Sequence, residues 1–454
     1  MQGVGVGKHG DIQVAVTFDN GKIQKIDILK NAENPVLSKK VFTDLKDQVA
    51  AASSVQVDIV SGATFTSKGM LDAIEDAAKK AGVTLGKADK NTLNVIVKDL
   101  PKNASYDVVV IGAGGAGFSA AIEAKNAGAN VVLLEKMPQV GGNSLISGAE
   151  MNVARNWVQP KLGITDDSPE LHAKDTYLGG DKKGDMNVIN VMTSNALAGA
   201  EWCRDYLGIR FEPDNLFFFG GHSRKRALIP VGHTGTEFIT KFLAKADELG
   251  IPVITNMKAE ELLKDKAGRV VGVKATMNGT EYTFNAKGGV VLATGGFGAN
   301  PAMVKKYNPK IDERFKTTDA PGTTGEALYM AQRAGAELVN MQYIQTYPIC
   351  DPISGVIELI ADARFDGAIM LNQEGKRFVE ELGRRDVLSE AILDQTGGYC
   401  WVLWNDKIGA VSNTVKDTDG IRCLHQAGHH DDLPGSEVHC RLHEDPLRQS
   451  EGHG

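Results

Sequence analysis

A glycine-rich turn, Gly112-Ala113-Gly114-Gly115-Ala116-Gly117, is the first candidate for a ligand-binding segment. It follows an apolar run at 108–111 and precedes a predicted helix over 118–127, and a second apolar run ends in Glu135, 18 residues after Gly117. Glycines at Gly112, Gly114 and Gly117 let the backbone approach a pyrophosphate at a helix N-terminus. Glu135 can accept hydrogen bonds from ribose hydroxyls. The pattern predicts a dinucleotide site in a βαβ unit.

A second loop, rich in small and polar residues, bears on which dinucleotide is bound. NAD and FAD share the first fingerprint, so the turn indicates a dinucleotide and not a reaction. Just after Glu135 come Gly142, Asn143, Ser144 and Gly148. Such a loop is expected where backbone must approach a flavin ring and its diphosphate. The sequence therefore favours FAD.

A third string, Asp58-Ile59-Val60-Ser61-Gly62-Ala63-Thr64, ends in an accessible hydroxyl. Its small residues permit close approach of another molecule to Thr64, but they equally suit a β-turn with a helix N-cap at Thr66 or Ser67. The string resembles the flavinylation motif of FMN-binding domains, D-x-x-[ST]-G-A-[TS], whose last hydroxyl is esterified to the FMN phosphate. The segments 9–12 and 19–23 are similar to the same domain. This resemblance implies covalent FMN on Thr64.

The composition is that of an ordinary globular chain. With 454 residues, 42% apolar and 24% charged, it has room for two or three domains of about 100–200 residues each. A net charge of −7, with cations spread along the chain, argues against a nucleic-acid partner and favours small-molecule ligands. Five widely spaced cysteines without a CxxC motif indicate neither a disulfide framework nor a metal site.

The sequence also bears on location. No run approaches the ~20 consecutive apolar residues of a membrane span, and the N-terminus lacks the blocks of a signal peptide. We expect no membrane span and a cytoplasmic protein, or an extracytoplasmic one if the start codon has been misassigned.

The pattern of elements divides the chain. In residues 1–85 we expect a hairpin around Asp19-Asn20-Gly21, helices over 42–52 and 66–81, and a strand-like piece at 55–60. Residues 86–105 are polar, contain Pro101 and indicate a linker. From Tyr106 a βαβ pattern begins, and a second buried strand is predicted over 289–293.

The end of the chain differs from the rest. From Cys423 onward it contains six of the ten histidines and two of the five cysteines, without an apolar period. These residues match no defined metal-site spacing: His425, His429, His430, His439, Cys440 and His443. The pattern stops near Asp417, as out-of-frame sequence would, and predicts an aberrant, disordered tail over 421–454.

From Gly3 to about Lys416 the chain resembles one family: the flavoprotein reductases of α,β-unsaturated carboxylates, which include soluble fumarate reductases and urocanate reductases. The resemblance implies an α/β fold. A small α+β FMN-binding domain would be followed by a Rossmann-like FAD-binding domain, with an inserted α+β capping domain that closes over the substrate. The expected bounds are 106–340 for the first part of the FAD domain and 341–420 for an incomplete capping domain. Because the family continues beyond this pattern, we expect the C-terminal part of the FAD domain to be missing.

The resemblance also implies contacts near the cofactor. Thr294 and Gly295 lie where the family contacts FAD. His233 and Thr234 lie where it has FAD and substrate contacts, and we assign them to substrate.

Three further segments match the family's active site. Tyr347 stands where fumarate reductases carry a substrate-binding histidine. Asp362 and Arg364 match the acid and the arginine of the family's proton relay, with aspartate in place of glutamate. Arg385 matches the catalytic arginine.

Tyrosine for histidine and aspartate for glutamate are the departures that urocanate reductases make. A urocanate pocket holds one carboxylate and one imidazole, for which Asp362 offers an acceptor to a ring N–H and Tyr347 a stacking face. The resemblance therefore favours reduction of urocanate to dihydrourocanate over reduction of fumarate to succinate.

The implied mechanism is hydride transfer from FAD N5 to the substrate carbon β to the carboxylate. Arg385 would deliver a proton to the α carbon, with Arg364 as relay partner and Asp362 near the substrate. FMN on Thr64, attached by a flavin transferase, would pass electrons to FAD. The electron donor is not identified, since neither a second nucleotide fingerprint nor a CxxCH haem site is present.

Two other hypotheses remain beside the two reductases. A truncated, inactive product could retain only an FMN-bearing domain. An FAD-dependent dehydrogenase of another substrate, such as a ketosteroid, is disfavoured by the FMN-like domain and by Asp362, Arg364 and Arg385 together.

Overall fold

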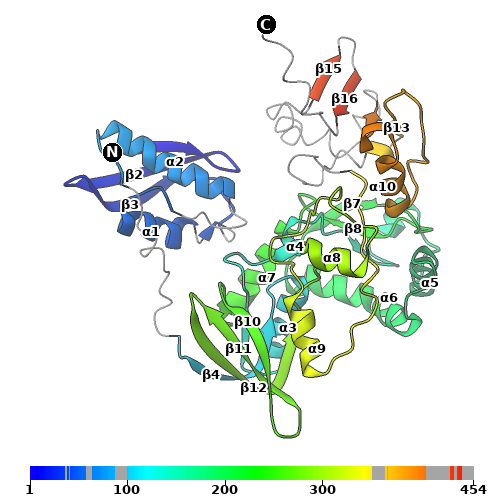
Figure 1. The fold of residues 1–454 in the computed structure, drawn as a ribbon, viewed down its shortest axis with the longest axis horizontal. Helices are drawn as coiled ribbons and strands as arrows, with labels where there is room; N and C mark the ends of the chain where they lie inside the picture. The colour runs from blue at the N-terminus through cyan, green and yellow to red at the C-terminus, as the bar shows by residue number, and fades with distance from the viewer. Residues whose placement is uncertain are drawn as a thin grey trace.

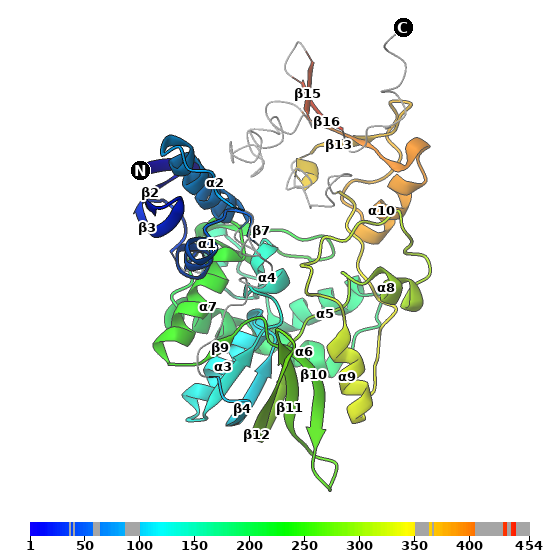
Figure 2. The same cartoon turned by 60° about the vertical axis from the view of Figure 1, so that its left-hand side comes forward.

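The computed structural model describes residues 1–35, 38–39, 41–57, 64–86, 100–349, 363–365, 367–404, 430–433 and 437–441. Within these ranges the strands form four sheets. Figures 1 and 2 show an N-terminal α+β unit beside a larger body built around a twisted sheet. Polar contacts between described residues of the two parts include the Asn34 amide, which donates to the Thr240 hydroxyl at 3.1 Å, and Lys39, which lies 3.4 Å from Asp247.

The N-terminal unit is a three-stranded antiparallel sheet packed against helices. Its strands, in the order β1-β2-β3, are β1 (Gln2–Val6), β2 (Asp11–Asp19) and β3 (Lys22–Lys30). The predicted hairpin is confirmed: Asn20 and Gly21 both have positive φ, 49° and 74°, as a two-residue type I′ turn requires. A π-helical turn (Val41–Leu45) leads into α1 (Lys46–Ala52), and α2 spans Thr64–Lys80.

In this unit the structure differs from the predicted strand over 55–57 and rules out the alternative of an N-cap at Thr66 or Ser67. Residues 55–57 form bends and not a strand, while 58–63 lie outside the described residues. Helix α2 begins at Thr64, so Thr66 and Ser67 lie inside its first turn and neither is an N-cap. The Thr66 hydroxyl instead donates to the buried carboxylate of Glu33 at 2.5 Å. This bond ties the first turn of α2 to the segment that follows β3.

Strand β1, which the sequence did not predict, packs its backbone directly against α2. A Cβ added to Gly3 would lie 1.9 Å from the carbonyl oxygen of Ala73, and one added to Gly5 would lie 2.0 Å from that of Gly69. Only glycine permits this approach. Gly3 and Gly5 are therefore the reason that the sequence pattern did not predict β1, and they are also the residues that allow β1 to pack against α2.

The central sheet of the larger body has the order β10-β11-β12-β4-β5-β9. Strands β12, β4, β5 and β9 are parallel, whereas β10, β11 and β12 are antiparallel. The bounds are β4 (Asn103–Ile111), β5 (Val131–Leu134), β9 (Val253–Ile254), β10 (Lys258–Lys264), β11 (Val270–Met277) and β12 (Thr280–Leu292). Strand β4 thus begins inside the segment 86–105 expected to be a linker, because Asn103 pairs with Thr283.

Alternate residues of β4 and β5 face two separate cores, as a strand period of two requires. Val110 and Leu133 pack with Phe118 of α3 (Gly115–Asn126) and Phe242 of α7 (Thr236–Glu248). On the other face, strands β4, β5 and β11 meet Met330 of α9 (Glu326–Ala334). The predicted βαβ unit is confirmed.

The strand predicted over 289–293 is present up to Leu292 as the end of β12, but it is not buried as expected. Val291 and Leu292 keep 37% and 38% of their surface exposed. Strand β11 stops pairing with β12 at Asn285, so beyond that point β12 pairs only with β4 among the described strands.

Further elements surround the sheet. Strands β6 (Met151–Asn152), β8 (Ala227–Pro230) and β7 (Phe211–Phe217) form a small sheet. The helices are α4 (Gly142–Ile146), α5 (Pro169–Gly179), α6 (Met186–Glu201) and α8 (Pro301–Tyr307), with a 3-10 turn at Gln159–Leu162 and a π-helical turn at Trp202–Tyr206. A last core contains β13 (Ile369–Leu371), α10 (Arg385–Leu393) and β14 (Trp401–Leu403).

Within the tail over 421–454, which we expect to be aberrant and disordered, two short segments are described. Strands β15 (His430–Leu433) and β16 (Glu437–Arg441) pair with each other, and β16 pairs antiparallel with β14. The rest of the tail, including His425, His429 and His443, lies outside the described residues.

The contact between β1 and α2 gives a testable expectation. Gly5→Ala should destabilise the N-terminal unit by about 2 kcal/mol or more, because the new methyl group overlaps the Gly69 carbonyl. Hydrogen exchange of the α2 amides should accelerate accordingly. Gly86→Ala is the matched control, since nothing lies within 4 Å of its added Cβ. Unchanged α2 protection in Gly5→Ala would contradict the packing.

Candidate functional site

The predicted dinucleotide residues meet at the carboxyl ends of parallel strands. The Gly112 N–H donates to the carbonyl of Leu134 at 2.8 Å, and the Ala293 N–H to that of Ile111 at 2.8 Å. The ends of β12, β4 and β5 are thereby joined side by side. Ligands of open α/β sheets bind outside this edge.

Glycine is required at two positions of the turn. Gly112 has φ of 102°, and a Cβ added to Gly117 would lie 1.7 Å from the carbonyl oxygen of Gly112. Helix α3 can therefore pack this close to the turn only because Gly117 lacks a side chain. At Gly114, the N-cap of α3, an added Cβ would come no nearer than 3.6 Å to any other group, so room remains at the helix N-terminus.

The acid and the second loop complete this edge. The Glu135 carboxylate accepts from the backbone N–H groups of Ala113 at 2.9 Å and Met137 at 2.8 Å. The Ser144 hydroxyl accepts from the Gly115 N–H at 3.1 Å, so the second loop lies against the first. Both predicted loops are brought together, as a cofactor with a diphosphate between them requires.

The remaining predicted FAD residues lie nearby. Asn143 donates its amide to Asp319 and accepts from the Ala320 N–H, both at 2.6 Å. Gly142 begins α4, Gly148 follows this helix, and Thr294 and Gly295 follow β12. The donor set and the open helix terminus fit FAD.

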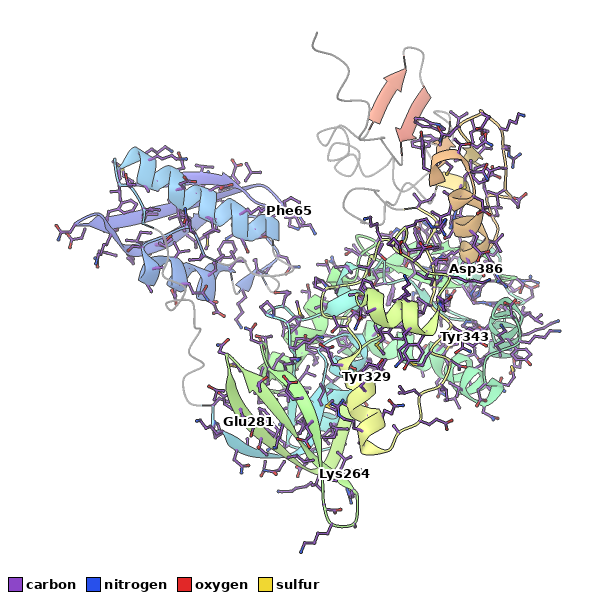
Figure 3. All side chains as sticks on the ribbon, in the orientation of Figure 1. Phe65, Lys264, Glu281, Tyr329, Tyr343 and Asp386 are labelled. Atoms are coloured by element: carbon purple, nitrogen blue, oxygen red, sulfur yellow. The ribbon has the colours of Figure 1, made fainter. Side chains whose placement is uncertain are left out.

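The predicted active-site residues Arg385 and Tyr347 are in contact. Arg385 is the first residue of α10, and its guanidinium lies 4.9 Å from the centre of the Tyr347 ring and 5.9 Å from that of Phe219. A guanidinium over aromatic faces is held by cation–π attraction. In Figure 3, Asp386, the next residue, marks the start of α10 above Tyr343. The helix N-terminus adds positive potential beside Arg385.

Arg364 and His233 join the same group through aromatic rings. The buried Arg364 guanidinium lies 4.8 Å from the Phe365 ring, which packs edge-on against Phe217 at 5.6 Å. Phe217 in turn lies 5.9 Å from the His233 ring and 4.7 Å from the Phe219 ring. Three phenylalanines thus connect residues that are far apart in the sequence.

Glu150 is a site residue that the sequence analysis missed. Its carboxylate is hydrogen bonded to Nε2 of His233. Burial favours the neutral form of Glu150, but the hydrogen bond and charge of His233, together with the charge of Arg385, lower its pKa below the usual value. Glu150 is therefore an anion near Arg385. Predicted residue Thr234 bonds instead to the Thr236 hydroxyl, at 3.2 Å.

Two adjoining cavities contain these groups. The larger, of about 1520 Å³, is lined by Glu150, Phe219, His222, Arg364 and Arg385. The second, of about 1030 Å³, is lined by Asn143, Thr323 and Tyr347. Residues 343–346 line both, so the cofactor loop and the predicted catalytic residues lie around adjoining cavities.

Two predicted residues cannot be placed. Asp362 lies outside the described residues, and of Thr64 only the backbone, at the start of α2, is described. Within the described ranges, no group of three or more histidine, cysteine, aspartate or glutamate residues could hold a metal ion. No helix in the same ranges is long and apolar enough to cross a membrane.

Comparison with known proteins assigns the family. A family model described as FAD binding domain matches residues 107–422, and one described as FMN-binding domain matches residues 7–79. The chain is 42% identical over 427 residues to urocanate reductase of Eggerthella lenta, covering 92% of this chain and 70% of that protein. The chain belongs to the FMN- and FAD-dependent reductases of unsaturated carboxylates. The similar proteins are named as reductases of urocanate, acrylate and fumarate.

Other members of the reductase family are also similar. NADH:acrylate oxidoreductase of Vibrio harveyi is 32% identical over 479 residues, covering 91% of this chain and 47% of that protein. The solved open conformation of a flavocytochrome c3 fumarate reductase has a TM-score of 0.62 and 32% identity, covering 70% of this chain and 56% of that one. The chain thus spans about half the length of these two relatives.

The close approach of Gly117 predicts a loss of cofactor in this reductase. Gly117→Ala should reduce bound FAD at least tenfold, because the added methyl group forces α3 away from the turn that follows β4. FAD released by heat from the purified protein measures occupancy. Gly199→Ala, in helix α6, is the control, since its added Cβ meets nothing nearer than 3.7 Å. Full FAD occupancy in Gly117→Ala would refute the expectation.

Proposed function

We propose that this chain reduces the C=C bond of an α,β-unsaturated carboxylate, with urocanate as the preferred substrate. The observation that carries the proposal is the placement of Arg385 over the ring of Tyr347, beside a cavity that also contains the Glu150 anion. The similarity to a urocanate reductase supports the same substrate.

The positive groups suit the carboxylate end of such a substrate. Arg385 at the N-terminus of α10 and Arg364 line one cavity. During reduction, charge accumulates on the carboxyl group of the substrate, and fixed cations stabilise it most strongly where water is excluded. We assign the carboxylate clamp to Arg385, Arg364 and the helix terminus.

The negative and aromatic groups suit an imidazole end. Glu150 can accept a hydrogen bond from a ring N–H, and Phe219 and Tyr347 offer aromatic faces. Asp362 is the second proposed acceptor. Fumarate would instead bring a second carboxylate toward the Glu150 anion, and like charges at close range are unfavourable. This contrast favours urocanate over fumarate, which remains the alternative substrate.

The proposed roles follow from this arrangement. FAD, when bound, supplies a hydride from N5 to the carbon β to the carboxylate. Arg385 gives a proton to the α carbon, and Arg364 and Asp362 return a proton to it. Arginine is a weak acid in water, with a pKa above ~12, so the transfer needs a site shielded from solvent. His233, which is hydrogen bonded to Glu150, and Thr234 stay proposed substrate contacts.

The N-terminal unit is proposed to carry the second flavin. FMN would be esterified to Thr64 by a flavin transferase and would supply electrons to FAD. The start of α2 at Thr64 supports the assignment, since the residue stands at a helix N-terminus where a phosphate is favourably placed. We retain 1–85 as the FMN-binding domain and 341–420 as the capping domain.

Reoxidation of the reduced protein tests the activity. Under anaerobic conditions, urocanate should reoxidise the dithionite-reduced flavin faster than fumarate. Arg385→Lys should lower kcat for urocanate about 100-fold or more, because proton delivery contributes on the order of 10²–10⁴. Arg333→Lys, in α9, is the control. Equal rates in wild type and Arg385→Lys would remove Arg385 from the mechanism, and no reoxidation by either acid would reject the function.

Replacement of Thr64 tests the flavin attachment. After coexpression with a flavin transferase, the denatured wild-type chain should show flavin fluorescence on a gel, and Thr64→Ala should show none. FAD content should stay the same, because the predicted FAD residues lie in the other domain. Thr43→Ala, an exposed hydroxyl of the same unit, should keep its fluorescence. Fluorescence in Thr64→Ala would place the attachment elsewhere.

A further inference from the structure

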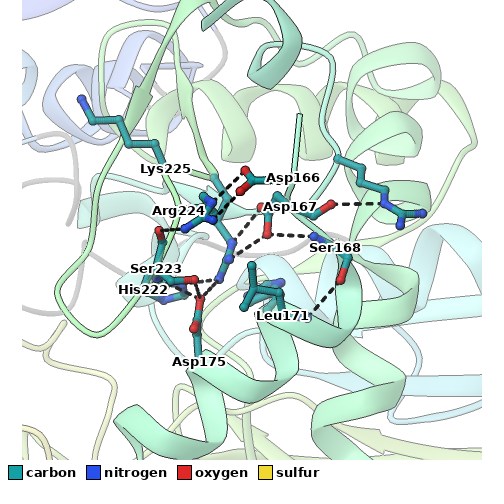
Figure 4. A network of polar contacts seen from close by, with 12 residues as sticks. Asp166, Asp167, Ser168, Leu171, Asp175, His222, Ser223, Arg224 and Lys225 are labelled. Carbon is teal, nitrogen blue, oxygen red and sulfur yellow. Dashed lines mark hydrogen bonds and ion pairs between the residues drawn. The ribbon is translucent and has the colours of Figure 1, made fainter. Parts of the chain in front are cut away.

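A buried arginine fixes one wall of the larger cavity. The Arg226 side chain is 0% exposed and forms a two-pronged ion pair with Asp167, through Nε at 3.0 Å and Nη2 at 2.8 Å. Its Nη1 donates to Asp175 at 2.7 Å and lies 2.9 Å from Nδ1 of His222. Figure 4 shows this network between helix α5 and the segment that carries His222.

The contact with Arg226 determines which nitrogen of His222 carries hydrogen. A guanidinium only donates hydrogen bonds, so Nδ1 of His222 must accept. The ring hydrogen is then on Nε2, and the neutral ring offers a single N–H donor at that position. With hydrogen on Nδ1 instead, the His222 ring and the Arg226 guanidinium would each direct an N–H group at the other.

The surroundings keep His222 neutral. Burial, followed by the charge of Arg226, lowers its pKa, while Asp175 and Asp167 act in the opposite direction. The neighbouring His172 ring lies 5.7 Å away and is buried. Burial, then the charges of Arg226 and His222, lower its pKa to about 4. Neither histidine gains a positive charge near neutral pH.

The backbone around His222 is fixed as well. The Ser223 N–H and hydroxyl both donate to Asp175, at 2.9 and 2.8 Å. The His222 N–H lies 3.3 Å from the Phe219 carbonyl, closing a turn. His222 and Phe219 line the cavity that also contains Glu150 and Arg385. A donor of fixed tautomer therefore stands in the wall of the proposed substrate site.

We propose that His222 is a specificity-determining residue whose Nε2–H donates to the acceptor nitrogen of a heteroaryl acrylate, and that Arg226 is its positioning residue. The inference rests on the proposed function. A neutral imidazole has one N–H donor and one acceptor nitrogen. Glu150 supplies an acceptor to the first and His222 a donor to the second. The carboxylate is left to the arginines.

Binding to the oxidised holoprotein tests the inference without turnover. The probes are urocanate and cinnamate, which share the acrylate but differ in that cinnamate has no ring nitrogen. His222→Leu should weaken urocanate binding about tenfold in isothermal titration calorimetry, the effect of about one hydrogen bond, and leave cinnamate binding unchanged. His222→Gln, which retains a donor near the Nε2 position, should restore most of the affinity. Lys225→Ala is the control on the same segment.

The outcomes separate the inference from the proposed function. If His222→Leu weakens the binding of urocanate and cinnamate equally, or changes the binding of neither, the role of His222 is overturned. If urocanate binding depends on His222 but urocanate is not reduced, the role of His222 is supported and the proposed function is rejected. If urocanate is reduced and its binding does not depend on His222, the proposed function is supported and the role of His222 is rejected. Absence of urocanate binding to the wild type would overturn both. A ¹⁵N spectrum of the His222 ring showing hydrogen on Nδ1 would overturn the positioning by Arg226.

Discussion

The burial of one guanidinium governs the substrate side of this molecule. Removing a cation from water costs several kcal/mol unless its hydrogen-bonding groups are matched, and breaking such a pair typically costs about 3–5 kcal/mol. Arg226 meets this demand with Asp167, Asp175 and His222. Because these partners come from the segment before α5, from α5 itself and from the segment before β8, matching the arginine also fixes these three segments relative to one another.

The cofactor side depends on a different constraint, the absence of side chains. Gly117 lets α3 approach the end of β4, and the second loop then reaches the same edge through Ser144. Asn143, from that loop, lines a cavity together with Tyr347. Gly117 therefore shapes the cofactor side, and Arg226 shapes the substrate side. The two sides adjoin where a flavin and a carboxylic acid would have to meet.

Local patterns predicted the parts of the fold that local forces determine. The Asn20-Gly21 turn and the βαβ unit at 108–134 formed as expected, since turn chemistry and apolar runs specify them. Strand β1 was missed because glycine is unfavourable in strands and its packing partner lies in α2. The exposure of Val291 depends on where β11 stops pairing. Glu150 bonds to a residue 83 positions away, which no local pattern reports.

The bonding of Glu135 has a consequence for nucleotide choice. Two backbone N–H groups hold its carboxylate at the end of β5, so the side chain cannot swing aside without leaving both unpaired. A fixed anion at this place suits a free ribose hydroxyl and repels a phosphate on the same ribose oxygen. A contact of Glu135 with the ribose would therefore disfavour 2′-phosphorylated dinucleotides before any contact with the redox-active ring is made.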